Sequence, residues 1–277
     1  MESSFSDRNR MAILQERLIR LRGDLNLFSE ASVVIPVNAK KDLASVLQII
    51  SDIAAYRGKH RLEIILVINN YPDDSPPNEI KAYRVLGLRI LGIPKIEHSD
   101  GDYFPTRIPG IRAAQSEATI HFDADCRLID PTALLDWYID QFDSGVQLAY
   151  THVGYCDLPP GISVKVRMFL HHLSRWIKRV ILDIPTSRGS NYAVERSFIL
   201  NLFDGGHLKY EIKVGPTIKT FQGKIVYSGS KKHDVLTSGR NFTGGWKELI
   251  DYLIWRIGYY QHLKPMESDS TISDHKS

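Results

Sequence analysis

Two aspartates separated by one residue, Asp123 and Asp125, directly follow an apolar segment of this 277-residue chain. In an extended or turn conformation, two carboxylates spaced in this way can reach the same side of one cation. Mg²⁺ and Mn²⁺ prefer oxygen ligands and are often shared with phosphate groups. Asp-x-Asp pairs also occur by chance in loops and as capping devices, so a structural role stays open. Position at the end of a strand favours metal binding.

The segments that must position this pair alternate between apolar runs and helical patterns. Such alternation is typical of a parallel sheet with right-handed crossovers, in which ligands bind at the carboxyl ends of the strands. The first strand is expected to stop at its proline, and residues 228–245, rich in Gly, Ser, Thr and Lys, predict a mobile loop. The expected strands are 32–37, 63–68, 88–91, 118–122 and 146–153, and the expected helices are 11–25, 42–56, 108–115, 131–142, 161–182 and 246–260.

Six segments in order resemble the family 2 glycosyltransferases with the GT-A fold, enzymes that use nucleotide-sugar donors. These segments are residues 34–38, 63–70, 107–114, 122–125, 189–194 and 223–227. The resemblance implies an α/β fold with a mixed, mainly parallel sheet flanked by helices, plus added N- and C-terminal helices. The implied organisation is an amphipathic helix with a frayed end (1–30), a nucleotide-binding half (31–130), an acceptor half with a closing loop (131–245), and a helix with a disordered tail (246–277).

By this resemblance, the chain would bind a UDP- or GDP-sugar together with Mn²⁺ or Mg²⁺. Asp125 would bind the metal directly, with Asp123 and His233 completing the site, and the ion would neutralise charge on the departing diphosphate. Either Asn69 or Asn70 stands where the family usually has an aspartate, which leaves the choice of base open. The residues expected to contact the donor are Pro36, Val37, Asn38, Asn69, Asn70, Arg107, Asp123, Ala124, Asp125 and Arg240.

The resemblance also assigns an acceptor side. Glu211 would be the general base of an inverting transfer, because the acceptor hydroxyl must lose its proton as it attacks the anomeric carbon. The structural alternatives are a surface ion pair of Glu211 with Lys209 or Lys213 and an ordinary ion pair for Arg107. The residues expected to line the acceptor side are Gly189, Ser190, Asn191 and Tyr192, for which turn chemistry is the competing account.

Two other functions remain open at this point. Asn69, Asn70, Tyr210 and Lys213 stand at positions that are usually acidic in the family, which is compatible with a degenerate GT-A domain that only binds or scaffolds. A nucleotidyl- or pyrophosphate-handling transferase on a similar sheet would also use the two aspartates. Such an enzyme should carry a Gly-rich basic signature near the first strand, and this sequence has none.

Composition limits the partners and the location. The net charge of +3 is too small to indicate a nucleic-acid partner. Cys126 and Cys156 lack CxxC spacing, which suits a reducing cytosol, and the polar N-terminus does not resemble a secretory signal, so we expect a cytoplasmic protein. The basic amphipathic segment 161–182 could lie on an anionic membrane and suit a lipid-linked acceptor, but packing of its apolar side on its own domain or a partner is favoured. Peripheral membrane contact and a homo-oligomer stay open.

Overall fold

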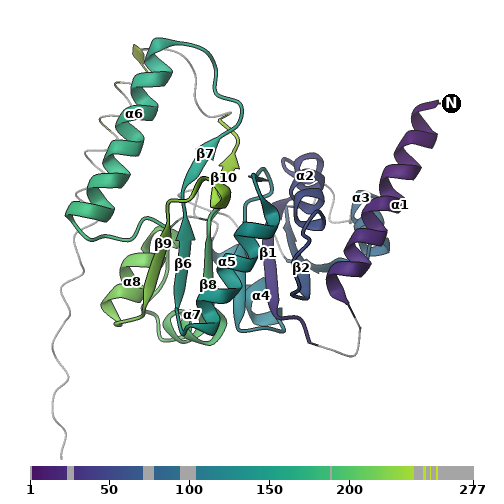
Figure 1. Ribbon diagram of the computed structural model, residues 1–277, viewed down its shortest axis with the longest axis horizontal. Coiled ribbons are helices and arrows are strands. Elements are labelled where there is room, and N and C mark those ends of the chain that lie inside the picture. Colours follow the sequence, from purple (N-terminus) through teal and green to yellow (C-terminus); the bar gives the residue numbers. More distant parts are fainter. Residues whose placement is uncertain are drawn as a thin grey trace, which may run out of the picture.

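A computed structural model describes residues 2–23, 28–70, 78–93, 104–187 and 189–239, and four further positions, Trp246, Lys247, Ile250 and Ile254. Its centre is a seven-stranded sheet with strand order β3-β2-β1-β4-β8-β6-β9 (Figure 1). The strands are β1 (Ala31–Asn38), β2 (Leu62–Asn69), β3 (Arg89–Gly92), β4 (Ala118–His121), β6 (Leu148–Thr151), β8 (Tyr192–Glu195) and β9 (Ile225–Ser228). Neighbouring strands are parallel except at β8, which is antiparallel to β4 and β6. The predicted mixed, mainly parallel α/β sheet is confirmed.

Two sets of helices cover the two faces of this sheet. One set is α1 (Glu2–Arg22), α2 (Leu43–Ala54), α3 (Asn78–Val85) and α5 (Pro131–Asp143), and the other is α4 (Phe104–Ala113), α7 (Arg196–Asp204) and α8 (Val214–Thr220). Alternate residues of a strand point to opposite faces, so a strand covered on both sides must be apolar throughout. In β1, Val33 and Ile35 belong to the first core, whereas Val34 packs with Val67 on the other face.

Helix α4 lies very close to β1 and β2 because it presents a glycine to them. A Cβ atom on Gly110 would lie 2.5 Å from Cγ1 of Val34 and 2.7 Å from Cγ2 of Val67. Both distances are shorter than van der Waals contact, so a larger residue would have to push the helix away from the sheet. Gly110 therefore sets the depth at which α4 carries Arg107 toward the end of β4.

A second sheet of three short strands, with order β5-β10-β7, lies beside the first. Its strands are β5 (Arg127–Leu128), β7 (Val153–Tyr155) and β10 (Val235–Thr237), and Val235 pairs with both Leu128 and Val153. The prediction of a mobile loop is therefore wrong for the part up to residue 239, where a 3-10 turn, η3 (Lys231–His233), leads into β10. Residues 240–245 lie outside the described part of the chain.

Other elements differ from their predicted bounds for local reasons. β1 continues through Pro36. Proline has no N–H to donate to a neighbouring strand, but β4 pairs with β1 only as far as Val34, so no hydrogen bond to β4 is lost at Pro36. The strand predicted at 146–153 divides into β6 and β7 at His152. Helix α1 begins at Glu2, where we expected a frayed end, and α3 was not predicted. The C-terminal helix is described only at the four positions given above, all helical, and the tail lies outside the description.

One long helical segment stands at the edge of the molecule. α6 (Ile162–Trp176) continues as a π-helix, η1 (Ile177–Ile181), and in Figure 1 it lies at the end of the molecule beyond β9. A 3-10 turn, η2 (Glu211–Lys213), precedes α8. None of the helices in the described part of the chain has the length and apolar character needed to cross a bilayer.

Replacing Gly110 with alanine should lower the free energy of unfolding by about 1–3 kcal/mol, because the added methyl group overpacks the α4 interface. Urea denaturation measures this change. Val34→Ala removes one of the two clashing methyl groups, so the double variant should lose less stability than the sum of the two single variants. Strict additivity would show that the close approach of α4 imposes no constraint.

Candidate active site

The carboxyl ends of the parallel strands bring the expected donor residues to one edge of the sheet. β1 and β2 pair in register, with Asn38 opposite Asn69, and the Ala39 N–H donates to the Asn69 carbonyl oxygen (2.8 Å). Asn70 adopts a left-handed backbone conformation (φ 55°), and its side-chain amide donates to Asn69 (3.3 Å). Pro36 and Val37 are buried in β1 just before this edge. A nucleotide placed here would meet main-chain groups and amide side chains.

Asp123 and Asp125 lie at the same edge, just after β4. Among the described residues they form, with Cys126, the one group of three metal-capable side chains whose ligand atoms lie within 4.8 Å of one another. The turn is closed by the Cys126 N–H, which donates to the Asp123 carbonyl oxygen (3.1 Å), and Ala124 is buried between the two aspartates. Both carboxylates are partly exposed, so they can reach a cation from solvent.

The chemistry of this group fits a hard divalent cation. Burial raises the pKa of the Cys126 thiol well above its ordinary value, so the sulfur stays protonated and is a poor ligand for Mg²⁺ or Mn²⁺. The oxygen donors are then the two aspartates, which is the donor type that these ions prefer. Thr237, on β10, donates its hydroxyl to Oδ1 of Asp125 (3.0 Å) and so orients that carboxylate.

Arg107 connects the aspartates to the opposite side of the site. Its guanidinium is fully buried, and it pairs with Asp123, with Glu211 (Nε to Oε1, 2.5 Å) and with the Phe122 carbonyl oxygen (Nη1 to O, 3.2 Å). Burial alone would lower the pKa of Arg107, but the two carboxylates together raise it above its ordinary value. The guanidinium is therefore charged, and both carboxylates need it as their counter-ion.

Glu211 is held between this arginine and an aromatic wall. Its side chain is 14% exposed, and Oε1 also accepts the Tyr192 hydroxyl (3.4 Å). Tyr192 stacks on His121, with ring centroids 4.6 Å apart and planes at 21°. Burial, with Arg107 nearby, lowers the pKa of His121 far below its usual range, so this ring is neutral and adds no second positive charge beside the guanidinium.

Gly189 makes room for the Arg107–Glu211 ion pair. A Cβ atom at this position would overlap the guanidinium and would lie 2.7 Å from Oε2 of Glu211. Sequence reasoning placed Gly189 at the acceptor, and the structure adds a packing reason for a residue without a side chain. Neither group can move away easily, because Arg107 is fully buried and the Glu211 side chain is only 14% exposed.

The other expected acceptor residues are mostly enclosed. Asn191 is fully buried, and its side-chain amide donates to the Thr151 carbonyl oxygen. Ser190 is buried beside Cys126, whose thiol approaches the Ser190 carbonyl oxygen (3.8 Å). These residues build the wall that joins β8 to β6 and the aspartate turn. Their contact with an acceptor stays a prediction.

One expected ligand, His233, is not brought into the aspartate cluster. His233 lies on η3, where its ring stacks on Trp137 (centroids 5.1 Å apart) and Nδ1 bonds to the Ser228 hydroxyl (2.7 Å). Within the part of the chain that the structure covers, His233 does not belong to the group of Asp123 and Asp125, and its role as a ligand stays a prediction. Arg240 lies outside the described residues.

Thr237 was missed by sequence reasoning although it contacts Asp125. It lies in a stretch rich in small polar residues, and only the pairing of β10 with β5 and β7 brings it to the aspartate turn. Local pattern carries no signal for a contact of this kind.

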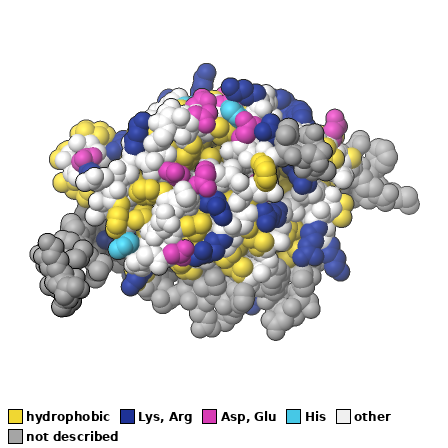
Figure 2. Space-filling model, turned by 90° about the horizontal axis from the view of Figure 1, so that it is seen from below, with side chains coloured by type: hydrophobic (Ala, Val, Ile, Leu, Met, Phe, Trp, Pro, Cys, Tyr) yellow, Lys and Arg dark blue, Asp and Glu magenta, His cyan; other side chains and the backbone are white. Residues whose placement is uncertain are grey.

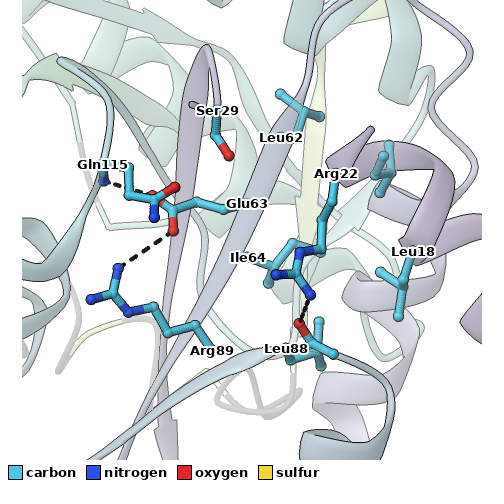
Figure 3. A pocket seen from close by; sticks show the side chains of 11 residues that line it. Leu18, Arg22, Ser29, Leu62, Glu63, Ile64, Leu88, Arg89 and Gln115 are labelled. Atoms are coloured by element: carbon cyan, nitrogen blue, oxygen red, sulfur yellow. Dashed lines mark hydrogen bonds and ion pairs between the residues drawn. The ribbon is translucent and has the colours of Figure 1, made fainter. Parts of the chain in front are cut away.

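A pocket of about 350 Å³ lies elsewhere, at the start of β2 between α1 and β3 (Figure 3). Its carboxylate, Glu63, accepts the Ser32 hydroxyl (2.5 Å) and the Gln115 N–H (2.7 Å) and pairs with Arg89 (3.6 Å). These partners satisfy the acid, and the pocket opens at the opposite end of the parallel strands from Asp123. The candidate site is therefore the aspartate edge.

Gly189→Ala should lower the free energy of unfolding by about 1–3 kcal/mol, because the methyl group displaces the Arg107–Glu211 pair. Gly229→Ala is the matched control, since a Cβ atom there would make only an ordinary contact with Tyr227 (3.4 Å). Urea denaturation of both variants measures the difference. Equal stability of the two variants would show that a methyl group at residue 189 does not displace the Arg107–Glu211 ion pair.

Comparison with known proteins identifies the fold. No protein-family model and no curated protein matches this sequence. Among solved structures, mannosyltransferase PcManGT from Pyrobaculum calidifontis, in complex with GDP-Man and Mn²⁺, matches 94% of this chain and 71% of its own at 13% identity, with a TM-score of 0.51.

Two other solved structures superpose less closely. Glucosyl-3-phosphoglycerate synthase from Mycobacterium tuberculosis is 17% identical, with a TM-score of 0.46, and the match covers 87% of this chain and 83% of the synthase. TarS from S. aureus is 15% identical, with a TM-score of 0.47, and the match covers 75% of this chain and 60% of TarS. On the strength of the mannosyltransferase match and the sheet order described above, this chain has the GT-A glycosyltransferase fold.

Proposed function

We propose that this chain is a metal-dependent glycosyltransferase that moves a sugar from a UDP- or GDP-sugar to a hydroxyl-bearing acceptor. The observation that carries the proposal is the pair Asp123 and Asp125 at the carboxyl edge of a GT-A sheet. The similar mannosyltransferase was solved with GDP-Man and Mn²⁺, which supports a donor and an ion of the same kind here. Fold alone does not specify an activity, so the activity must come from the residues of the site.

Each side of the site has a separate task in this proposal. Asp125, oriented by Thr237, and Asp123 would hold Mn²⁺ or Mg²⁺, which supplies neutralising charge for the departing diphosphate. The ends of β1 and β2, with Asn38 and Asn69, would hold the nucleoside through amide and main-chain groups. An asparagine offers both a donor and an acceptor, so this edge suits more than one base.

Glu211 is the proposed general base of an inverting transfer. Arg107 and Tyr192 both contact Oε1, which fixes the orientation of the carboxylate. Arg107 is then a positioning residue, because it is buried between the two acids and holds both of them.

A catalytically inactive binding domain is the second candidate, and one observation favours it. Glu211 is already engaged in a strong ion pair, as expected for a structural role, although its partner is Arg107 and not the surface lysines considered from the sequence. The two candidates differ in chemistry and share the donor site, so binding and turnover must be measured separately.

Asp125→Asn should abolish the part of UDP or GDP binding that depends on Mn²⁺ and weaken nucleotide affinity by about tenfold or more, because one of the two charged ligands is lost. Isothermal titration calorimetry with and without Mn²⁺ measures the effect. Asp143→Asn, an exposed position on α5, is the matched control. Wild-type binding that is equally strong without metal would contradict a metal-dependent donor site.

Glu211→Gln should leave donor binding nearly unchanged and lower turnover by about a hundredfold to ten-thousandfold, because the variant keeps an oxygen for Arg107 but loses the proton acceptor. Release of the nucleotide from the donor sugar reports turnover, and calorimetry reports binding. Lys213→Gln, in the same turn as Glu211, is the control for a general disturbance of η2.

Two outcomes would decide against this role. Full activity of Glu211→Gln together with an inverted product, established by NMR of the anomeric configuration, would exclude Glu211 as the base. Absence of turnover in the wild-type chain across UDP- and GDP-sugars, with intact Mn²⁺-dependent binding, would favour the inactive binding domain.

A further inference from the structure

The helical segment α6–η1 presents an apolar face to solvent. The exposed positions recur at steps of three and four residues, which places them on one side of the helix. Ile162 is 72% exposed, Phe169 65% and Trp176 46%. We call this face the outer row, and its members are Ile162, Val166, Phe169, Leu173, Trp176 and Val180. Ile181 and Leu182 extend it at the end of η1 and are also exposed.

The opposite face of the same segment is mainly polar and points into the protein. His171, Arg175 and Lys178 are buried, and Arg175 donates to the Thr186 carbonyl oxygen (3.1 Å). His171 also contacts the Tyr155 hydroxyl (3.5 Å), although Val164 and Met168 add apolar surface to this face. A helix on the surface of a soluble protein usually turns its apolar side inward. Packing on its own domain, one of the two forms of the favoured prediction, is therefore not seen for the outer row among the described residues, and packing on a partner stays a prediction.

The location of the segment leaves this face accessible. α6 forms one end of the molecule in Figure 1, and Figure 2 shows hydrophobic side chains gathered at the surface on that same side. Trp246, Ile250 and Ile254, three helical positions four residues apart, are exposed as well. They present a second exposed apolar row.

Charge decides between the occupants that could cover the outer row. Residues 162–181 contain no Asp or Glu, and of their five cations Arg175 and Lys178 are buried, so Lys165, Arg167 and Arg179 are the ones at least partly exposed. A two-fold contact between copies of this chain would bring two such cationic segments together, which electrostatic repulsion opposes. An anionic lipid surface instead attracts the cations and accepts the apolar row at the same time.

We propose that the outer row lies in the headgroup region of an anionic lipid membrane. A helix in this position buries its apolar side at the boundary of the acyl chains and turns its polar side away from the bilayer. In this chain the polar side meets the protein body through Arg175 and His171. Lys165 is exposed beside the row and can approach lipid phosphates, whereas the Arg179 guanidinium lies over the Tyr227 ring, 3.7 Å from its centroid.

Co-sedimentation of the full chain with vesicles tests this proposal. The chain should bind vesicles of phosphatidylcholine mixed with phosphatidylglycerol, bind pure phosphatidylcholine vesicles more weakly, and dissociate as salt rises. The double variant Phe169→Glu, Trp176→Glu should lower the fraction bound by about tenfold or more, because both charges would enter the apolar boundary. Val85→Glu, an exposed apolar position on α3, is the matched control and should bind as wild type.

Three results would overturn the proposal. They are no binding of the wild-type chain to either vesicle, equal binding of wild type and the double variant, and a wild-type dimer in light scattering that the double variant converts to a monomer, which would assign the outer row to a second copy. Both substituted side chains are exposed, so circular dichroism should show an unchanged fold. Nucleotide binding with Mn²⁺, measured on the same samples, keeps this test separate from the proposed function.

Discussion

Arg107 is buried between two carboxylates that come from distant parts of the chain, and the candidate site depends on this arrangement. Asp123 follows β4 and belongs to the metal-capable pair, whereas Glu211 begins the turn η2 on the other side. A buried guanidinium is tolerated only when it is paired, and each carboxylate in turn needs a nearby cation. One side chain therefore fixes the distance between the two halves of the site.

Two glycines give this arginine its place. Gly110 lets α4 approach β1 and β2 closely, and Gly189 leaves the space that the guanidinium and Glu211 fill. Both positions need a glycine because a side chain there would overlap neighbouring atoms; a left-handed backbone is not the reason, since neither glycine has one. Because neither position carries a side chain, there is room for the long, charged side chain of Arg107 to be buried at the ends of the strands.

Much of the fold could be predicted because its signals are local. Apolar runs and helical periodicity located β1, β2, α2 and α5, and the alternation of strands and helices indicated a mainly parallel sheet with Asp123 and Asp125 at its carboxyl edge. The partners of charged residues could not be predicted, because ion pairing depends on distances set by tertiary packing. Sequence reasoning offered lysines close in the chain to Glu211, and the actual partner comes from α4.

The same limit applies to orientation. Periodicity showed that residues 161–182 form a helix with two unlike faces, but it cannot say which face meets the protein. Likewise His233 lies in the expected stretch of chain, yet Trp137 and Ser228 determine where its ring points. Thr237 reaches Asp125 through strand pairing in the second sheet, which no local pattern encodes.

The reversed orientation of α6 also affects how stability is distributed. In the isolated protein the outer row stays hydrated, so α6 gains less from the hydrophobic effect than helices whose apolar side faces the sheet. Beside the apolar contacts of Val164 and Met168, its position depends on polar contacts such as Arg175 with Thr186 and His171 with Tyr155. Backbone amides of α6 should therefore exchange with solvent through local opening, at a lower free energy than those of β1 and β2. This end of the molecule can adjust its structure while the sheet stays folded.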